Sequence, residues 1–121
     1  MKFDSENQRV YKISSVIRKE IAQIIKTDIN DPRIKDVIIT EVDISKDLKH
    51  AKIFFLIFNY QNKTAENIIA ITKTINASKL FFKRKLSKSS NLRTVPNLRF
   101  VYDDTEVRAF ELENLINKSL Y

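Results

Sequence analysis

The residues in this sequence that are best suited to chemistry are basic, and most of them stand in one short segment. Residues 80–93, LFFKRKLSKSSNLR, carry five basic side chains and no acidic one. In a helix, side chains four residues apart, such as Arg84 and Lys88, lie on the same face. A fan of such charges suits the backbone phosphates of a nucleic acid, which require positive charge and reach but no fixed pattern of donors. With the lysine that precedes the segment, the candidate phosphate ligands are Lys79, Lys83, Arg84, Lys85, Lys88 and Arg93.

The net charge of the chain has the same origin. The formal charge is +7, and residues 67–102 contain eight of the 22 basic side chains and none of the 15 acidic ones. This asymmetry favours a polyanionic partner, although a basic face can also serve only to keep a protein soluble. A basic amphipathic helix can lie on a membrane, but the loop residues within the segment and its narrow apolar stripe argue against that use.

A second, weaker candidate RNA surface lies in the first predicted helix. Lys12, Lys19 and Lys26 repeat every seven residues, which places them together opposite the apolar stripe of that helix. Among the aromatic residues, Phe81 could stack on a base, but packing in the core is the more common fate of a phenylalanine. The basic residues lack an accompanying set of Asn, Gln or aromatic platforms, so we expect the shape of a folded RNA, more than its base sequence, to decide binding.

Residues suited to catalysis or metal binding are scarce. His50 is the single histidine and there is no cysteine, so the chain lacks the usual ligand sets for zinc. Asp103 and Asp104 could hold Mg²⁺ as a pair, but two aspartates before Thr105 are also ordinary turn and helix-capping chemistry. The complete lack of glycine excludes the P-loop and the dinucleotide-binding fingerprint. We predict a protein without catalytic activity, metal or cofactor.

The first half of the chain reads as a helix and a hairpin. A stripe that includes Ile17, Ile21 and Ile24 predicts a helix from about Ser5 to the sequence NDPRI, where the proline ends it. Residues 36–44 and 50–60 alternate as strands, and the polar residues 45–49 between them predict an antiparallel turn. The second strand is apolar on both faces in its later half, which favours a central or covered position. The expected shared faces are Ile38, Thr40, Val42 and Ile44 in the first strand and Ala51, Ile53, Phe55 and Ile57 in the second.

The second half reads as two helices, a strand and a terminal helix. The helical stripe falters over NASK at residues 76–79 and resumes with Phe82 and Leu86, which predicts two helices meeting at a bend. We expect a loop at residues 87–91, a strand at residues 98–102 and a short helix from Thr105. The order helix, strand, strand, helix, helix, strand, helix predicts a two-layer α+β sandwich around a small mixed sheet.

Length and hydropathy indicate one soluble domain. A chain of 121 residues suits a single domain, and 43% hydrophobic residues suffice for a packed core. The N-terminal sequence MKFDSENQRVYK has no apolar run of the signal-peptide type, and the run IFFLIF at residues 53–58 is too short to cross a bilayer. We expect a cytoplasmic monomer that forms one domain over residues 1–121, with residues 1–6 and 117–121 frayed.

Three pieces of the sequence resemble one protein family. DPRI at residues 31–34, SKDLKHAKIF at residues 45–54 and LRTVPNLRFVYD at residues 92–103 stand in the order in which ribosome-binding factor A carries them. That family is a group of bacterial ribosome-assembly factors, and the similarity extends from Arg9 to about Leu115. It implies a KH-like fold of type II, which begins with a helix and has a mixed three-stranded sheet packed by helices, without the GXXG loop of other KH domains.

The resemblance also implies a function and a local departure from the family. It implies a noncatalytic assembly factor that binds the free small (30S) ribosomal subunit and its 16S rRNA, promotes late rRNA maturation and supports growth in the cold. In place of GXXG the family carries an Ala-x-Gly kink between its paired helices, which falls here on Ser78, Lys79 and Leu80. Leu80 therefore stands where the family has glycine, and a shift by one residue would put Ala77 first.

Other functions remain open at this stage. A general RNA-binding protein or a permanent ribosomal protein would use the same basic residues. An RNA-processing nuclease would use Asp103 and Asp104 with Mg²⁺. A protein-interaction module would use the apolar side chains of the second strand, namely Phe54, Phe58 and Tyr60.

Overall fold

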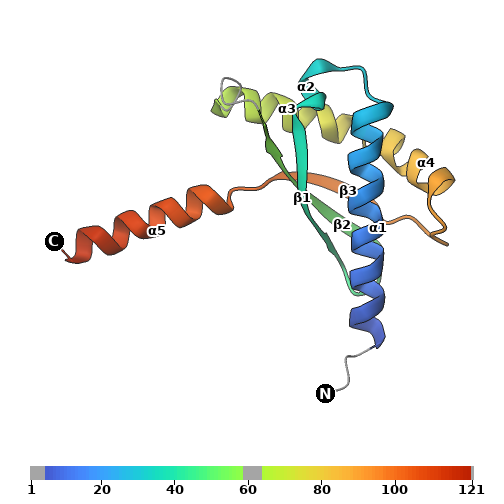
Figure 1. Ribbon diagram of the computed structural model, residues 1–121, viewed down its shortest axis with the longest axis horizontal. Coiled ribbons are helices and arrows are strands. Elements are labelled where there is room, and N and C mark those ends of the chain that lie inside the picture. Colours follow the sequence, from blue (N-terminus) through green and yellow to red (C-terminus); the bar gives the residue numbers. More distant parts are fainter. Residues whose placement is uncertain (1–4, 59–63, 121) are drawn as a thin grey trace.

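The structure is a computed structural model that describes residues 5–58 and 64–120. Its elements follow the predicted order, with one short additional helix after the first (Figure 1). The helices are α1 (Ser5–Thr27), α2 (Pro32–Lys35), α3 (Ala65–Ala77), α4 (Lys79–Ser89) and α5 (Thr105–Leu120). The strands are β1 (Val37–Ile44), β2 (His50–Ile57) and β3 (Asn97–Tyr102). The predicted α+β class is confirmed. Residues 1–4 and 121, from the ends expected to fray, lie outside the described residues.

The three strands form one mixed sheet in the order β1–β2–β3. β1 and β2 are antiparallel, whereas β2 and β3 are parallel. The central place of β2 agrees with its apolar sequence on both faces. α1 packs on β1, and α3 and α4 pack on β3. These three helices form the second layer of the fold (Figure 1).

The hydrophobic core lies between the sheet and these helices. Every second residue of β2 is buried, as predicted, including Ile53 and Phe55 with no exposed surface. Ile21 of α1 and Phe82 of α4 are also fully buried, and the ring of Phe82 lies 5.0 Å from that of Phe100 on β3. Among the described residues, no polar or charged side chain is buried. The core is therefore held together by apolar burial, which contributes about 25 cal/mol per Å².

One predicted strand face is wrong because β1 contains a β-bulge. The pairing with β2 shifts between residues 39 and 41, so Thr40 is an extra residue without a partner. A bulge moves every following side chain to the opposite face relative to simple alternation. Ile38, predicted to share a face with Val42, is therefore 44% exposed, and Val37 is buried instead.

The first helix ends before the proline segment, which begins the next helix. α1 ends at Thr27, and Asp31 is the N-cap of α2, where its carboxylate accepts a hydrogen bond from the Arg33 N–H at 3.0 Å. Pro32 occupies the first helical position, where its missing N–H costs nothing. The sequence predicted only the helix end, so α2 is an addition from the structure.

The bend between the paired helices lies at Ser78. Its N–H donates to the Ile75 carbonyl oxygen at 3.1 Å, and its own carbonyl oxygen accepts from the Phe82 N–H at 3.2 Å. The two helices therefore share this residue, and Lys79 and Leu80 form the first turn of α4. α4 continues to Ser89, so the loop predicted at residues 87–91 begins later than expected.

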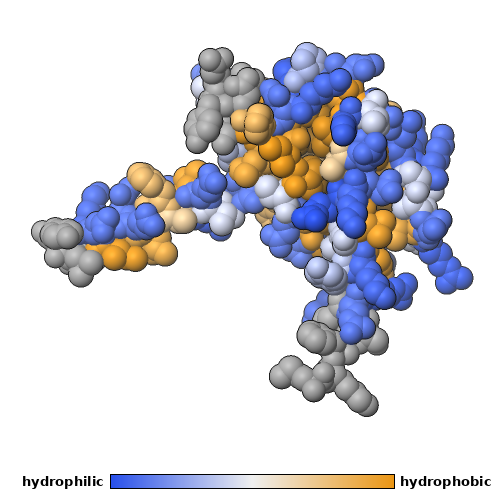
Figure 2. Space-filling model, in the orientation of Figure 1, coloured by the Kyte–Doolittle hydropathy of each residue, from blue (hydrophilic) through white to orange (hydrophobic). Residues whose placement is uncertain are grey.

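α5 projects away from the two-layer body (Figure 1). Its apolar side chains stay exposed, from 48% for Ile116 to 65% for Leu115. Figure 2 shows this as hydrophobic surface along α5, separate from a second hydrophobic area over the upper part of β1. Within the described residues, no helix combines the length and the apolar character needed to cross a membrane.

Candidate nucleic-acid interface

α4 presents basic side chains because its apolar side is anchored in the core. Phe82 and Leu86 are four residues apart and both are fully buried. The charged side chains occupy the other faces of the helix, which do not pack against the core. Lys79, Arg84 and Lys88 are exposed there. α4 therefore carries its charge on a surface whose orientation is set by the packing of two side chains.

Two of the six predicted phosphate ligands already have partners in the protein. Lys83 Nζ donates a hydrogen bond to Asn97 Oδ1 of β3 at 2.8 Å. Lys85 Nζ lies 3.8 Å from Asp28 Oδ2 and 5.6 Å from the centre of the Phe81 ring. Both lysines belong to α4 and are half-buried. A phosphate would compete with these partners, so we rank the two lysines below the exposed residues as phosphate ligands.

The other four predicted ligands are exposed and have no partner among the described residues. No hydrogen bond or ion pair within the described part of the chain engages their side chains. An unpaired guanidinium or ammonium group carries no internal interaction that must break before it meets a phosphate. These residues are Lys79, Arg84, Lys88 and Arg93.

Two hollows join the predicted residues into one surface. The first, of about 440 Å³, lies between α4 and the segment before β3 and is lined by Lys83, Arg84 and Arg93. The second, also of about 440 Å³, lies between that segment and α1 and is lined by Arg93, Arg9 and Lys12. Because Arg93 lines both, the hollows adjoin. We call these five residues, Arg9, Lys12, Lys83, Arg84 and Arg93, the basic track.

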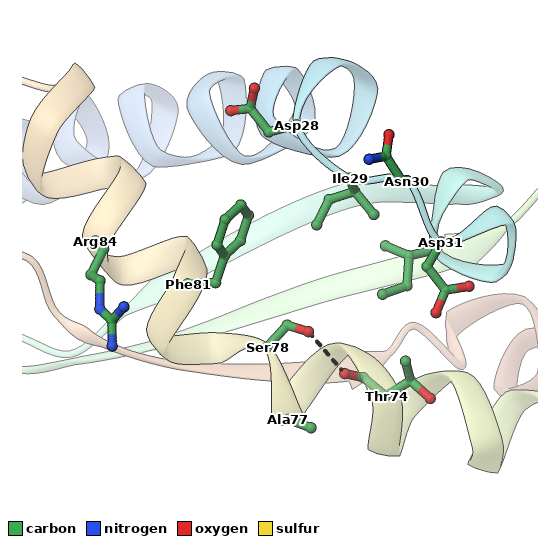
Figure 3. A pocket seen from close by; sticks show the side chains of 10 residues that line it. Asp28, Ile29, Asn30, Asp31, Thr74, Ala77, Ser78, Phe81 and Arg84 are labelled. Carbon is green, nitrogen blue, oxygen red and sulfur yellow. Dashed lines mark hydrogen bonds between the residues drawn. The ribbon is translucent and has the colours of Figure 1, made fainter.

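A third hollow lies where α3 meets α4, beside the connection from α1 to α2 (Figure 3). It has a volume of about 500 Å³. Ile29, Ile34 and Phe81 give it apolar walls, and Arg84 belongs both to this hollow and to the basic track. We call it the junction hollow. It extends the track from the α1 side of the molecule to the bend at Ser78.

Acidic side chains stand at the edge of the junction hollow. Asp28 and Asp31 both line it. The side chain of Arg33 donates hydrogen bonds to both carboxylate oxygens of Asp31. Together with the hydrogen bond from the Arg33 backbone N–H, they hold the pKa of Asp31 below its usual range. Asp31 is therefore ionised at neutral pH and acts only as a hydrogen-bond acceptor.

The second candidate surface is divided by the structure. Lys12, Lys19 and Lys26 are all exposed on α1. Lys12 lines the same hollow as Arg93 and so belongs to the basic track. Lys19 and Lys26 line none of the three hollows and lie further along α1.

The paired aspartates support the start of α5. Asp103 Oδ1 accepts hydrogen bonds from the Thr105 N–H at 3.0 Å and the Thr105 hydroxyl at 2.5 Å, and Oδ2 accepts from the Thr40 hydroxyl at 2.7 Å. The hydrogen bond from the Thr105 hydroxyl, followed by that from Thr40, holds the pKa of Asp103 below its usual range. Asp104 pairs with Arg108 at 3.0 Å. Both carboxylates thus have structural partners.

The remaining candidates are spread over the surface. His50 is exposed at the first residue of β2. In the parts of the chain that the structure describes, no three His, Asp or Glu side chains gather closely enough to hold a metal ion. Phe54 is half-buried, Phe58 is 74% exposed, and Tyr60 lies outside the described residues.

Sequence reasoning missed two contributors to this surface. Arg9 precedes Lys12 by three residues, a helical spacing that could have identified it as a neighbour. The junction hollow combines residues 28–34 with residues 74–84. No local pattern joins these segments, since only the packing of α4 beside α1 brings them together.

Comparison with known proteins gives a consistent result. The family model for ribosome-binding factor A matches residues 9–116. The ribosome-binding factor A of Pseudomonas syringae pv. tomato is 39% identical over 115 residues, which cover 95% of this chain and 82% of that protein. Ribosome-binding factor A from Thermus thermophilus, a crystal structure, has a TM-score of 0.65 at 17% identity and covers 77% of this chain and 93% of its own.

A second Thermus thermophilus structure places that protein in a complex. It is a homology model of the ribosome-binding factor fitted into a cryo-EM map of a 30S–RbfA complex, with a TM-score of 0.56 at 18% identity over 74% of this chain and 90% of that one. At such identities the two structural matches support the KH-like fold. The family match and the curated relative, which both span most of the sequence, show that this chain belongs to the ribosome-binding factor A family.

Proposed function

We propose that this chain is a noncatalytic ribosome assembly factor that binds the free small (30S) ribosomal subunit and contacts phosphates of its 16S rRNA. The observation that carries the proposal is the basic track, in which the unpaired Arg84 and Arg93 line adjoining hollows on one side of the molecule. Lys79 and Lys88 extend the charge on either side along α4. Family membership and the 30S complex of a Thermus relative support the choice of the small subunit as the partner.

The chemistry of the track suits RNA phosphates. Arginine donates two parallel hydrogen bonds to one phosphate, and lysine acts as a mobile point charge. Each phosphate that is neutralised releases bound counterions, so affinity falls as salt rises. A surface of this kind follows the shape of a folded RNA backbone and reads little sequence. The proposed factor therefore recognises the shape of an RNA surface on the small subunit.

The proposal includes the biological role. The chain promotes late maturation of 16S rRNA and supports growth in the cold. It acts as a cytoplasmic monomer without a cofactor or small-molecule substrate. A strain that lacks the chain is expected to accumulate immature 16S rRNA, more strongly at low temperature. Unchanged rRNA processing in such a strain would remove this part of the proposal.

Co-sedimentation tests the partner directly. The purified protein is centrifuged with isolated small subunits, large subunits and joined ribosomes, at low and at high salt. We expect binding to free small subunits alone, weakening steeply with salt. Equal binding to all three would favour a general RNA-binding protein, and retention on joined ribosomes through a high-salt wash would favour a permanent ribosomal protein.

A double charge reversal tests the surface. Arg84→Glu combined with Lys88→Glu is expected to abolish most binding to small subunits while the circular-dichroism melt stays unchanged, because both side chains are exposed and have no partner in the described part of the chain. The matched control is Lys46→Glu with Lys118→Glu, two exposed lysines that line none of the three hollows. Equal effects of the two pairs would mean that only net charge matters and would reject the track.

A further inference from the structure

We propose that the junction hollow binds one unstacked RNA base that carries an exocyclic amino group, as the specific element beside the nonspecific basic track. The inference rests on the proposed function and adds a ligand for a site that the phosphate contacts do not use. A volume of about 500 Å³ lies within the range of small-ligand sites, about 300–1,000 Å³. Arg84 connects the hollow to the track. A nucleotide whose phosphate meets Arg84 therefore has its base within reach of the hollow.

The walls of the hollow suit a flat apolar object. Ile29 and Ile34 belong to the hydrophobic core and line the hollow, and Phe81 lines it from α4. Figure 3 shows the Phe81 ring on the side of the hollow opposite Asp31. Phe81 is 37% exposed, although phenylalanine is usually buried. Stacking of a base on an aromatic side chain is a common way in which proteins hold single-stranded RNA.

The Phe81 ring is held in place for stacking. It packs against the Phe82 ring in a T-shaped arrangement, with 78° between the ring planes and 6.1 Å between the ring centres. Lys85 Nζ lies over the ring at 5.6 Å from its centre, and Asp28 in turn fixes Lys85. Phe81 keeps 37% of its surface exposed beside these two contacts, and this exposed part is what a base can meet. The role of Lys85 is then to hold the Phe81 ring in position, and not to bind a phosphate.

The edge of the hollow favours a base that donates hydrogen bonds. Asp28 and Asp31 offer carboxylate oxygens, and Asn30 adds an amide. Carboxylates accept hydrogen bonds from the amino groups of cytosine, adenine and guanine. Uracil has no amino group, and its N3–H stands between two carbonyl oxygens that a carboxylate repels. The same carboxylates repel phosphate, so the sugar–phosphate backbone stays outside, on Arg84. The hollow is thus expected to discriminate against uracil.

Short RNAs test the inference. The probes are a fluorescently labelled heptamer of uridine and three heptamers in which the central residue is adenosine, cytidine or guanosine, with dissociation constants measured by anisotropy. We expect at least one of the three to bind the wild-type protein between about fivefold and about 150-fold more tightly than the uridine heptamer, the range of discrimination that hydrogen bonds to one base supply. Equal affinities, or no binding of any heptamer by a protein that still binds small subunits, would overturn the inference.

Three variants assign the preference to the hollow. Phe81→Ala should reduce the affinity for the preferred heptamer to that for uridine, whereas Phe110→Ala, which removes an exposed ring from α5, should not. Asp28→Asn replaces a carboxylate at the edge by an amide, which can donate to the carbonyl oxygens of uracil. The ratio between the affinities for the preferred heptamer and for the uridine heptamer should therefore fall. A preference unchanged in Phe81→Ala would overturn the inference, as would a loss of small-subunit binding in that variant with RNA affinities intact, since the hollow would then hold a protein side chain.

Failure of this inference differs from failure of the proposed function. If Arg84→Glu with Lys88→Glu abolishes binding to small subunits but Phe81→Ala leaves all RNA affinities unchanged, the track stands and the base site falls. If the wild-type protein binds no small subunits yet prefers one heptamer through Phe81, the base site stands and the assembly function falls.

Discussion

The side-chain amide of Asn76 forms two hydrogen bonds with the backbone of Phe100. Its nitrogen donates to the carbonyl oxygen at 2.9 Å, and its oxygen accepts from the N–H at 2.8 Å. β3 is an edge strand, so these backbone groups have no strand partner on that side. Because Asn76 lies two residues before Ser78, this contact fixes the end of α3, and with it the junction hollow, against the sheet.

Replacing Asn76 by alanine is expected to destabilise the domain by about 2 kcal/mol. The change leaves a partly buried N–H and carbonyl of β3 without partners, and each unsatisfied group costs roughly 1–3 kcal/mol when it is fully buried. Urea unfolding measures the difference. Asn114→Ala, the same change at an exposed position of α5, should alter the unfolding free energy by less than about 0.5 kcal/mol. Equal effects of the two substitutions would reject a structural role for the Asn76 amide.

The three lysines of α1 are expected to differ in RNA binding. Lys12→Glu should weaken binding to small subunits, because Lys12 shares a hollow with Arg93. Lys26→Glu should have a smaller effect, since Lys26 is outside the basic track. The two variants have the same charge and both substituted residues are exposed. Binding at several salt concentrations distinguishes them, and the slope of log K against log salt should fall by about 1 for Lys12→Ala. Equal losses of affinity in the two variants would mean that the RNA-binding surface includes the whole outer face of α1.

Acid is expected to weaken the junction between β1 and α5 through Asp103. The pKa of Asp103 in the folded protein is below its usual range because of hydrogen bonds from Thr105 and Thr40. A lowered folded-state pKa means that the stabilisation is complete above the unfolded value, about 3.9, and is lost as the pH falls through the folded value.

The variant Asp103→Asn should therefore be less stable than the wild type at neutral pH, and the difference should shrink below about pH 4. Unfolding free energies in urea across this pH range measure it. Asp43→Asn serves as control, because Asp43 is exposed and its carboxylate forms no hydrogen bond or ion pair within the described residues. A constant difference between wild type and Asp103→Asn at all pH values would contradict the assignment.

Removal of α5 is expected to leave the two-layer domain folded. The described apolar side chains of α5 are about half to two-thirds exposed, and the helix stands apart from the body (Figure 1). A chain that ends after Glu106 keeps the Thr105 contacts to Asp103. Its free energy of unfolding should lie within about 0.5 kcal/mol of that of the full chain. Its far-ultraviolet circular dichroism should lose the helical signal of α5. A large loss of stability would show that α5 packs against the body in solution.

Local patterns in the sequence were enough to identify most of the fold. The helical spacing of Ile17, Ile21 and Ile24 and the alternation along β2 reflect the need of each element to bury one face. The faltering stripe at residues 76–79 indicated the division between α3 and α4 for the same reason. The bulge at Thr40 could not be predicted, because the alternation of apolar residues along one strand does not say how that strand pairs with its neighbour. The register shift is defined only by the pairing of β1 with β2, and the Thr40 side chain is placed by Asp103, 63 residues away.

The candidate site divides in the same way. The sequence by itself determined which residues are basic, that they gather in residues 79–93, and that the chain resembles ribosome-binding factor A. Only the tertiary structure decided which of those charges are available. Packing of α4 between α1 and β3 pairs Lys85 with Asp28 and Lys83 with Asn97, and it leaves Arg84 and Arg93 unpaired within the described chain. The same packing places the end of α1 beside the bend at Ser78 and so creates the junction hollow, because side chains far apart in the sequence meet only when the core closes.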